Sequence, residues 1–446
     1  MNWLIEKISE GTDKTAVIFK EKEYSYETLY QSICMDYERV KASFQPGNVI
    51  AIVSDYSFES ISLFFALHEN HNIIVPITTK VQSEIDDRIN VAGCDYVVSI
   101  NDEGWSFNKR EHSDAPHQLV STLQNESHSG LILFSSGSTG KPKAMIHNLD
   151  NLIDTYKDKR GKRLVFLIFL MFDHIGGLNT LLNCLSMNVA MVFPENREPD
   201  HVAHLIEKYK VNILPASPTF LNLMLIGECP AHYDLTSLRM ITYGTEPMPE
   251  SLLVKLKYAF PRVKFLQTFG TSETGISTTS SYSSTSTFLK IDDPNTEYKI
   301  INGELWLRSK TQIMGYLNSS MERFTDDGWF KTGDMVEEKD GYIKIIGRNS
   351  DIINVGGEKV LPSEVESVLF QMPHVNDCIV YGEKNPITGQ MVVAKVLYNE
   401  DIKASELKKL VVEFCKDKLT RYKIPAKVVK MSDSEFTERY KKKRIN

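Results

Sequence analysis

Short apolar runs and longer helical patterns alternate along the first two-thirds of the chain. Eight runs rich in β-branched residues have the length of buried strands, at residues 49–53, 73–75, 96–100, 131–134, 164–170, 189–193, 211–214 and 240–243. Between them lie amphipathic stretches with an apolar face, such as residues 58–69, 83–91 and 201–209. This alternation predicts parallel sheets covered by helices.

The pattern changes near residue 303, where the strands become shorter and turns more frequent. After Arg348 the expected order is strand, helix 362–370, strands 377–381 and 392–397, helix 405–419 and strand 426–430. The Ser/Thr-rich stretch 277–287 is expected to be a loop. We therefore predict an α/β protein. Its large N-terminal body, residues 1–349, has parallel sheets covered by helices plus a β-rich subdomain. A small mobile α+β domain follows at residues 350–446.

Charge and composition exclude several classes of protein. The 446 residues include 51 Lys and Arg against 58 Asp and Glu, a net charge of -7, whereas a dedicated nucleic-acid binder needs a basic face. Six cysteines without a C-x-x-C pair favour free thiols in a reducing compartment. The first ten residues lack the apolar core of a signal peptide, and the most apolar run is too short to span a bilayer. We expect a cytoplasmic protein with no nucleic-acid partner and no membrane span.

A glycine- and hydroxyl-rich segment follows one of the predicted strands. It is Ser135-Ser136-Gly137-Ser138-Thr139-Gly140-Lys141, with Lys143 two residues later. Ligands of open α/β sheets bind at this end of a strand, where backbone N–H groups, hydroxyls and lysines suit phosphates. It is not a Walker loop, because only two residues separate its glycines and a proline follows Lys141. The alternative is a surface loop without a ligand.

This segment resembles the phosphate-binding loop of the adenylate-forming superfamily, which includes acyl-CoA synthetases, adenylation domains and luciferases. Further landmarks of that family follow in its order along nearly the whole chain. They are Tyr24-Ser25-Tyr26, Pro46-Gly47-Asn48-Val49, Gly244-Thr245-Glu246-Pro247, Phe269-Gly270-Thr271-Ser272-Glu273, Gly303-Glu304-Leu305, Gly315-Tyr316, Thr332-Gly333-Asp334 and Gly347-Arg348. Each is short, so the resemblance rests on their ordered succession.

The resemblance implies ATP-binding roles for these segments. Gly244, Thr245 and Glu246 would line the adenine pocket, and the ring of Phe269 would face the adenine, with Gly270, Thr271 and Ser272 beside it. Glu273 would hold the Mg²⁺ that accompanies ATP, joined by the Ser135 hydroxyl, because hard oxygen ligands suit this ion.

Two charged residues would complete the nucleotide site. Asp334 would accept hydrogen bonds from the ribose hydroxyls, and Arg348 would lie near ribose or phosphate. Taken singly, Asp334 could be a turn residue and Glu273 a solvated carboxylate.

The chain end resembles the family's Thr-x-x-Gly-Lys-x-x-Arg motif, beginning at Thr437. This implies that Lys441 is the catalytic lysine of adenylation, bridging the acyl oxygen and the α-phosphate. Tyr440 stands where glycine is usual, and Glu435 where proline is usual. Lys442 or Lys443 therefore remains an alternative, as does a solvated basic tail.

The resemblance also implies a hinge and a thiol tunnel. Ser350 occupies the hinge position, where a small polar residue can absorb a backbone rotation. Gly356 and Gly357 would let a pantetheine arm pass close to the backbone. The alternative for these glycines is a turn that needs positive φ.

His174 follows the predicted strand at which the family places its acyl pocket, and the resemblance implies that it lines that pocket as a catalytic residue. A satisfied core histidine is the alternative. The neighbouring Asp173 resembles the aspartate that binds the substrate ammonium in amino-acid-activating domains. The His68-Glu69-Asn70-His71 sequence lacks the spacing of H-E-x-x-H and is not expected to bind zinc.

Together these features imply ATP-dependent activation of a carboxylic acid to an acyl-adenylate, with release of pyrophosphate and transfer of the acyl group to a thiol. CoA is the preferred thiol. A free-standing ligase that loads the phosphopantetheine of a carrier protein is the alternative, and a catalytically degenerate nucleotide-binding protein is less favoured. The sequence does not identify the acid.

Overall fold

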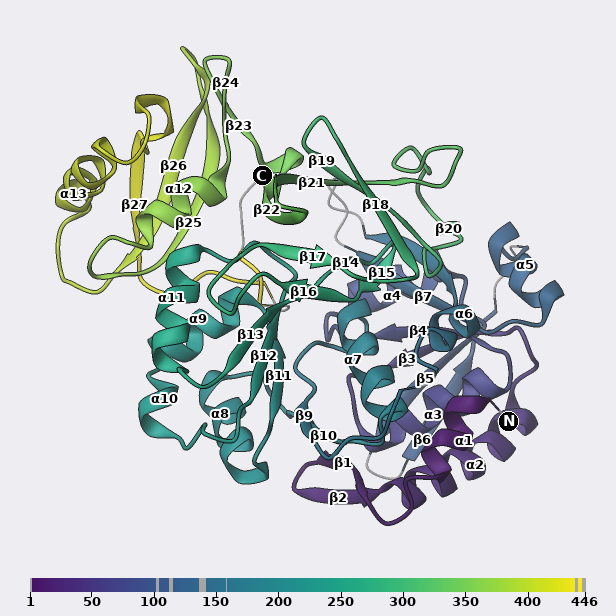
Figure 1. Ribbon diagram of the computed structural model, residues 1–446. Coiled ribbons are helices and arrows are strands. Elements are labelled where there is room, and N and C mark those ends of the chain that lie inside the picture. Colours follow the sequence, from purple (N-terminus) through teal and green to yellow (C-terminus); the bar gives the residue numbers. More distant parts are fainter. Residues whose placement is uncertain are drawn as a thin grey trace.

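The N-terminal body contains two seven-stranded sheets (Figure 1). The computed structural model describes residues 2–101, 104–111, 115–135, 142–157, 159–437 and 440–442. The first sheet has the order β13 (Lys264–Gln267), β12 (Met240–Tyr243), β11 (Ile213–Ala216), β9 (Val165–Leu167), β10 (Ala190–Phe193), β1 (Thr15–Phe19) and β2 (Lys22–Ser25). Only the outermost pair, β1 and β2, is antiparallel.

The second sheet has the order β20 (Gly315–Tyr316), β8 (Lys143–Asn148), β7 (Gly130–Ser135), β4 (Ile73–Ile77), β3 (Val49–Val53), β5 (Tyr96–Asn101) and β6 (Gly104–Lys109). Its central strands, β7, β4, β3 and β5, are parallel, and antiparallel strands flank them. Buried on both faces, the central strands are almost continuously apolar, as is typical of covered parallel sheets.

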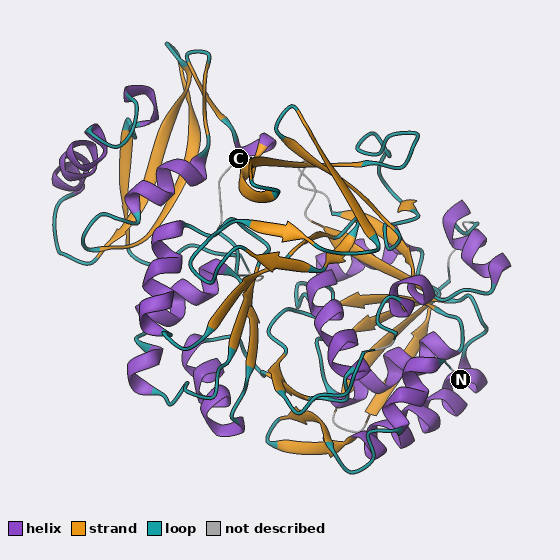
Figure 2. Cartoon of the chain, in the orientation of Figure 1, coloured by secondary structure: helices purple, strands orange, loops and turns teal. Residues whose placement is uncertain are grey.

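Helices cover both sheets (Figure 2). They are α1 (Trp3–Ser9), α2 (Tyr26–Ser43), α3 (Phe58–Glu69), α4 (Gln82–Ala92), α5 (Gln118–Glu126), α6 (Leu149–Asp154), α7 (Ile175–Ser186), α8 (Pro199–Tyr209), α9 (Pro218–Ile226), α10 (Cys229–His232) and α11 (Glu250–Ala259). The local sequence fixes their beginnings: in α3, Ser57 and Ser60 form a reciprocal capping box.

A third, β-rich part follows the two sheets. The ribbon of β14 (Phe269–Thr271) and β15 (Gly275–Ser277) precedes an antiparallel sheet of order β16 (Thr279–Ser281), β17 (Leu289–Ile291), β22 (Tyr342–Arg348), β21 (Phe330–Lys339), β19 (Glu304–Ser309) and β18 (Thr296–Ile301). The expected loop at 277–287 is therefore wrong in part, because β16 pairs with β17 through backbone hydrogen bonds that serine and threonine do not prevent.

The C-terminal residues form an α+β unit with its own apolar core. Its elements are the 3₁₀ turn η1 (Asn349–Asp351), β23 (Ile353–Val355), β24 (Glu358–Val360), α12 (Pro362–Leu369), β25 (Val375–Asn385), β26 (Gly389–Tyr398), α13 (Ala404–Lys416), η2 (Arg421–Lys423) and β27 (Lys427–Met431). In Figure 1 this unit lies at the upper left, over α9 and α11. The predicted fold class is confirmed.

Two details differ from expectation. The strand expected at 164–170 is confined to β9, and the chain after it lines a cleft instead of extending the sheet. The sequence pattern did not predict β1 or β2, because β1 is short and is placed by its pairing with the distant strand β10. None of the six cysteines, all of which lie among the described residues, forms a disulfide, and five are buried.

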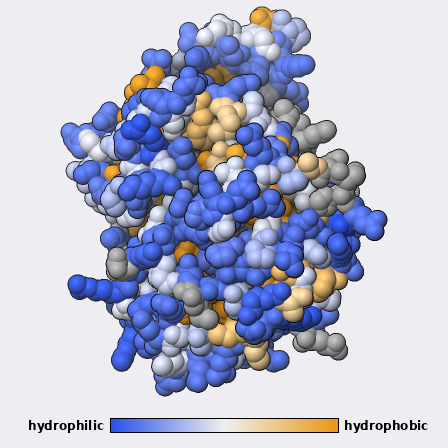
Figure 3. Space-filling view, turned by 90° about the vertical axis from the view of Figure 1, so that its right-hand side faces the viewer, coloured by the Kyte–Doolittle hydropathy of each residue, from blue (hydrophilic) through white to orange (hydrophobic). Residues whose placement is uncertain are grey.

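The outer surface shown in Figure 3 is mostly hydrophilic, with scattered apolar residues. Across the described parts of the chain, we find no helix that combines the length and apolarity needed to cross a bilayer.

Candidate active site

A cleft of about 930 Å³ lies between the carboxyl ends of β11–β13, the β-rich part and the end of the chain. Most of the site residues expected from the sequence line it. These are Ser135, Lys143, His174, Gly244, Thr245, Glu246, Phe269, Gly270, Thr271, Ser272, Glu273, Asp334, Arg348, Ser350 and Lys441. The structure therefore brings together segments as far apart in sequence as Ser135 and Lys441.

The remaining expected residues fall into two groups. Ser136, Gly137, Ser138, Thr139, Gly140 and Lys141 lie outside the described residues. Gly356 and Gly357 form the turn between β23 and β24, with φ of +62° and +94°, and do not line the cleft. This left-handed backbone agrees with the alternative given above, a turn that needs positive φ.

The backbone packs closely where the adenine is expected. A Cβ atom on Gly270 would lie 2.3 Å from the carbonyl oxygen of Gly275, and one on Gly244 would lie 2.7 Å from Oγ1 of Thr268. Glycine is therefore required at both positions. Thr245 has φ of +72°, which is unusual for a β-branched residue and recurs at functional sites.

Glu273 is buried at the cleft wall and is held by a phenol. The Tyr316 hydroxyl donates a hydrogen bond to Oε1 of Glu273 at 3.0 Å, and Nη1 of Arg323 lies 4.0 Å from the same oxygen. Burial, together with the Glu273 carboxylate, raises the pKa of Tyr316, so the phenol stays protonated and donates. No sequence motif assigns a role to the Tyr316 hydroxyl or to Arg323, because neither contact is local in sequence.

The donor set around Glu273 fits a magnesium ion that arrives with its nucleotide. Among the described residues no group of three His, Cys, Asp or Glu side chains could hold a metal by itself. Mg²⁺ usually binds through one or two carboxylates, substrate phosphates and water. A single buried carboxylate that lines the same cleft as Ser135, the first residue of the expected phosphate loop, satisfies that requirement.

Asp334 and Arg348 face each other across the β21–β22 ladder. Nε of Arg348 donates to Oδ1 of Asp334 at 3.1 Å, and the backbone N–H of Asp334 donates to Oγ1 of Thr332. Burial raises the pKa of Asp334, whereas Arg348 acts to lower it. The result is an acceptor for hydroxyl groups, fixed in orientation by an adjacent cation.

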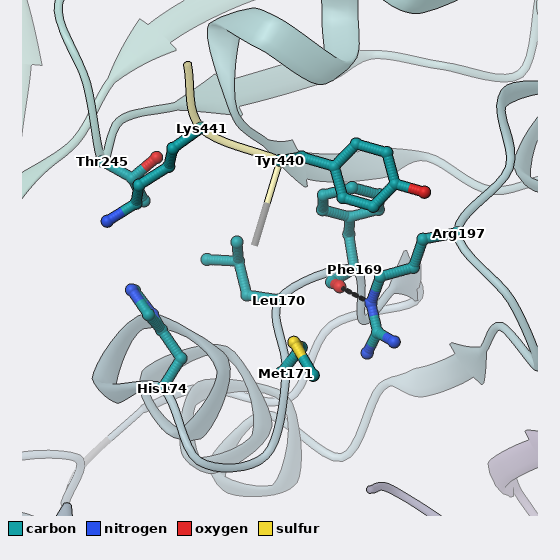
Figure 4. Close-up of a pocket in the computed structure, with 8 residues that line it drawn as sticks. All are labelled: Phe169, Leu170, Met171, His174, Arg197, Thr245, Tyr440 and Lys441. Atoms are coloured by element: carbon teal, nitrogen blue, oxygen red, sulfur yellow. Dashed lines mark hydrogen bonds between the residues drawn. The ribbon is translucent and has the colours of Figure 1, made fainter. Parts of the chain in front are cut away.

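His174 forms the N-cap of α7, where its Nδ1 accepts a hydrogen bond from the Gly176 N–H at 3.0 Å. In a neutral ring, Nδ1 as acceptor leaves the proton on Nε2. The half-buried ring faces the open space in Figure 4 and lines the large cleft. His174 is therefore not a core histidine.

Asp173 is turned away from the cleft. It is 3% exposed, and its Oδ2 lies 3.1 Å from Nη1 of Arg88 on α4. Its carboxylate therefore serves a buried ion pair, and the likeness to an ammonium-binding aspartate is not supported.

The end of the chain presents Lys441 to the cleft. Lys442 also borders it, but its Nζ donates to the Cys378 carbonyl at 2.7 Å and lies 3.4 Å from the buried Glu366 carboxylate. The Lys442 ammonium thus belongs to the C-terminal core, which favours Lys441 among the candidate lysines. Lys443 lies outside the described residues.

Tyr440 docks this segment onto the body. Its φ is +52°, a conformation that costs an L-residue about 1–2 kcal/mol and suits glycine. Its ring is 8% exposed and packs in the apolar cluster of the first sheet, and Oγ of Ser217 donates to its carbonyl oxygen at 2.6 Å. In the sequence, Tyr440 is distinguished only by its departure from the motif, and no local pattern indicates this long-range contact.

Family models match the chain along most of its length. Residues 5–317 match the AMP-binding enzyme model, and residues 364–441 match the AMP-binding enzyme C-terminal domain. The chain belongs to the AMP-binding enzyme family.

Named relatives and solved structures resemble the chain over nearly its full length. It is 26% identical to a 2-succinylbenzoate–CoA ligase of Bacillus subtilis, covering 96% of this chain and 93% of that protein. An o-succinylbenzoate CoA synthetase of the same species, solved with its acyl-adenylate, has a TM-score of 0.76 at 22% identity, covering 99% of this chain and 96% of that one. An anthranilate CoA ligase bound to anthranoyl-AMP has a TM-score of 0.80 at 20% identity, covering 98% and 94%. The two structures show that the fold is shared.

Proposed function

We propose that this AMP-binding enzyme is an ATP-dependent acid–thiol ligase that converts a carboxylic acid to an acyl-adenylate and then to a thioester. One observation carries the proposal: a single cleft gathers the buried carboxylate Glu273, the Asp334–Arg348 pair and the terminal Lys441. Each has the chemistry of a different part of Mg-ATP and its reacting phosphate.

In the first step, a carboxylate oxygen of the acid attacks the α-phosphorus of ATP and pyrophosphate leaves. Glu273 would hold the Mg²⁺ that neutralises phosphate charge. Asp334 accepts hydrogen bonds from the ribose hydroxyls, and Phe269 lies against the adenine. The Lys441 ammonium stabilises the charge that develops between the acyl oxygen and the α-phosphate. The protein thus contributes mainly orientation and charge.

In the second step, a thiol attacks the acyl carbon and AMP leaves. This step uses another placement of the C-terminal domain. The domain, residues 350–446, turns about Ser350 relative to the N-terminal domain, residues 1–349. The present arrangement supports this: Lys441 lines the cleft, whereas the Gly356–Gly357 turn does not. Ser350 itself lies in the short turn η1 at the cleft edge.

CoA is the proposed thiol, because the similar proteins above are named as CoA ligases. His174, at the N-terminus of α7, would contact the acyl group. The phosphopantetheine of a carrier protein is the acceptor that an assay must separate from CoA.

The test is acid-dependent exchange of pyrophosphate into ATP, followed by thioester formation. The purified protein is given Mg-ATP and a panel of aliphatic, aromatic and amino acids, and each acid that supports exchange is then offered CoA and a holo carrier protein. We expect exchange with a subset of the acids and a CoA thioester from the same subset. Binding of ATP without exchange for any acid would contradict the proposal, and thioester on the carrier alone would replace CoA as the acceptor.

A further inference from the structure

A second, much smaller cavity adjoins the active-site cleft. It has a volume of about 10 Å³, room for about one water molecule. Leu170, His174, Thr245 and Lys441 border both spaces. The small cavity therefore adjoins the cleft and lies in a second direction from His174.

The ring of Tyr440 blocks the space in this second direction. In Figure 4 the ring lies over Phe169 and beside Arg197, on the opposite side of the space from His174. Tyr440 borders the small cavity but not the large cleft. The other direction stays open along α7, where Asn179, Thr180 and Ile276 line the cleft.

Packing and hydrogen bonding fix the ring in this place. Its centroid lies 5.4 Å from those of both Phe169 and Phe220, and Phe436 stacks on it at 4.9 Å with an interplanar angle of 16°. The hydrogen bond from Ser217 holds the backbone of the same residue. Such a wall does not yield to a substrate as a loosely packed side chain would.

Tyr440 also precedes Lys441 directly in the sequence. The residue that presents the proposed catalytic lysine is thus the one that limits the space beside it. The Tyr440 ring and the Lys441 ammonium take up these positions together, because the ring docks in the body only when the terminal segment is in place.

We infer that Tyr440 is a specificity-determining residue of this enzyme, which excludes acids that are branched or doubly substituted near the carboxylate. The inference rests on the proposed function. Its substrate class is compact or linear carboxylic acids that extend from His174 along α7, since a second branch would meet the Tyr440 ring.

The experiment compares matched acids in pyrophosphate exchange, for example hexanoate with 2-ethylhexanoate and phenylacetate with diphenylacetate. Tyr440→Gly removes the ring and suits the left-handed backbone. We expect it to raise the ratio of kcat/KM for the branched over the linear acid by roughly 10-fold or more, the scale of a changed pocket contact. Tyr440→Phe keeps the ring and should keep the ratio.

Phe436→Ala is the matched control for docking. Phe436 stacks on Tyr440 but borders neither cavity, so its loss should lower exchange for linear and branched acids alike. A Tyr440→Gly variant that behaves like Phe436→Ala, with an unchanged ratio, would overturn the inference.

Tyr440→Leu provides the same comparison if the glycine variant loses all exchange. If Tyr440→Gly and Tyr440→Leu both lost exchange with every acid, Tyr440 would have only a structural role, and the inference would also be overturned. Failure of the proposed function is distinct, because the unaltered enzyme would then show no exchange with any acid.

Discussion

Two regions line the cleft and differ in how they are held in place. The nucleotide wall, with Phe269, Glu273 and Asp334, belongs to strands of the N-terminal body and to the loops that join them. The terminal segment, residues 440–442, comes from a unit with a separate core. Where the segment meets the body, it is held by the Ser217 and Glu246 hydrogen bonds and by the buried Tyr440 ring.

This difference indicates which residues each step depends on. A wall built into sheets is preorganised for ATP whether or not the terminal segment is docked. A segment held by a few long-range contacts can be withdrawn and returned as a unit, without disturbing the sheets of the body. Variants in the wall should therefore affect every reaction of the nucleotide, whereas variants at the docking contacts should affect only the step that uses Lys441.

The largest effect is expected at Glu273. Glu273→Gln keeps the shape and an acceptor for the Tyr316 hydroxyl but removes the charge that a Mg²⁺ requires. Pyrophosphate exchange should fall by roughly 10²-fold or more, as expected when a preorganised charge is lost. Tm should stay near that of the unaltered protein. Glu337→Gln, on an exposed end of β21, is the matched control and should be neutral; equal activities of the two variants would remove Glu273 from the mechanism.

A smaller effect is expected at the ribose site. Asp334→Asn leaves a weaker acceptor beside Arg348, and hydrogen bonds to charged groups contribute about 1.5–3 kcal/mol. The KM for ATP should rise roughly 10-fold or more in exchange, and AMP should bind more weakly by a similar factor. An effect on the KM of the acid instead of the KM of ATP would contradict the ribose assignment.

The docking contact should matter less, and for one step only. Ser217→Ala removes the hydrogen bond to the Tyr440 carbonyl, and a typical net contribution of about 0.5–1.5 kcal/mol corresponds to a roughly two- to tenfold slower exchange. Conversion of pre-made acyl-adenylate to thioester should be unchanged. Asn222→Ala, which removes a hydrogen bond from α9 to the Asn376 carbonyl, offers a second docking variant. Equal losses in both steps would argue against docking as the function of these contacts.

The smallest effect on catalysis is expected in the body away from the cleft, where a substitution should change stability instead. Burial acts to raise the pKa of Asp150, but hydrogen bonds from His68, His128 and the Ser129 N–H prevail and lower it from 3.8 to about 2. A depressed carboxyl pKa stabilises the fold above the unfolded value and loses that contribution as pH falls through the folded value. The free energy of unfolding should drop by roughly 2 kcal/mol between pH 4 and pH 2 through this group. Denaturant unfolding of Asp150→Asn should lack this part of the pH dependence; an unchanged slope would show that the cluster does not stabilise the body.

The sequence predicted most of the body because its central strands and covering helices are local patterns. The strands β3 and β12 and the helix α3 have the expected limits, since apolar runs and caps act over a few residues. The family motifs, found in their usual order, also identified most of the residues that line the cleft.

The remaining features depend on contacts between distant residues. Nothing near Tyr316 indicates that its hydroxyl holds Glu273, and nothing near Tyr440 indicates that its ring enters the body. The position of the Gly356–Gly357 turn outside the cleft likewise depends on how the C-terminal unit docks. Such contacts require the tertiary structure, because their partners lie tens to hundreds of residues away.

The central claim is that the terminal segment serves adenylation while the wall serves both steps. Lys441→Ala, assayed in the two half-reactions separately, tests it most directly. We expect pyrophosphate exchange to fall by roughly 10²-fold or more, because one preorganised charge is removed. Conversion of pre-made acyl-adenylate and CoA to thioester should stay within a few-fold of the unaltered enzyme. Intact exchange, or an equal loss in both half-reactions, would contradict the account.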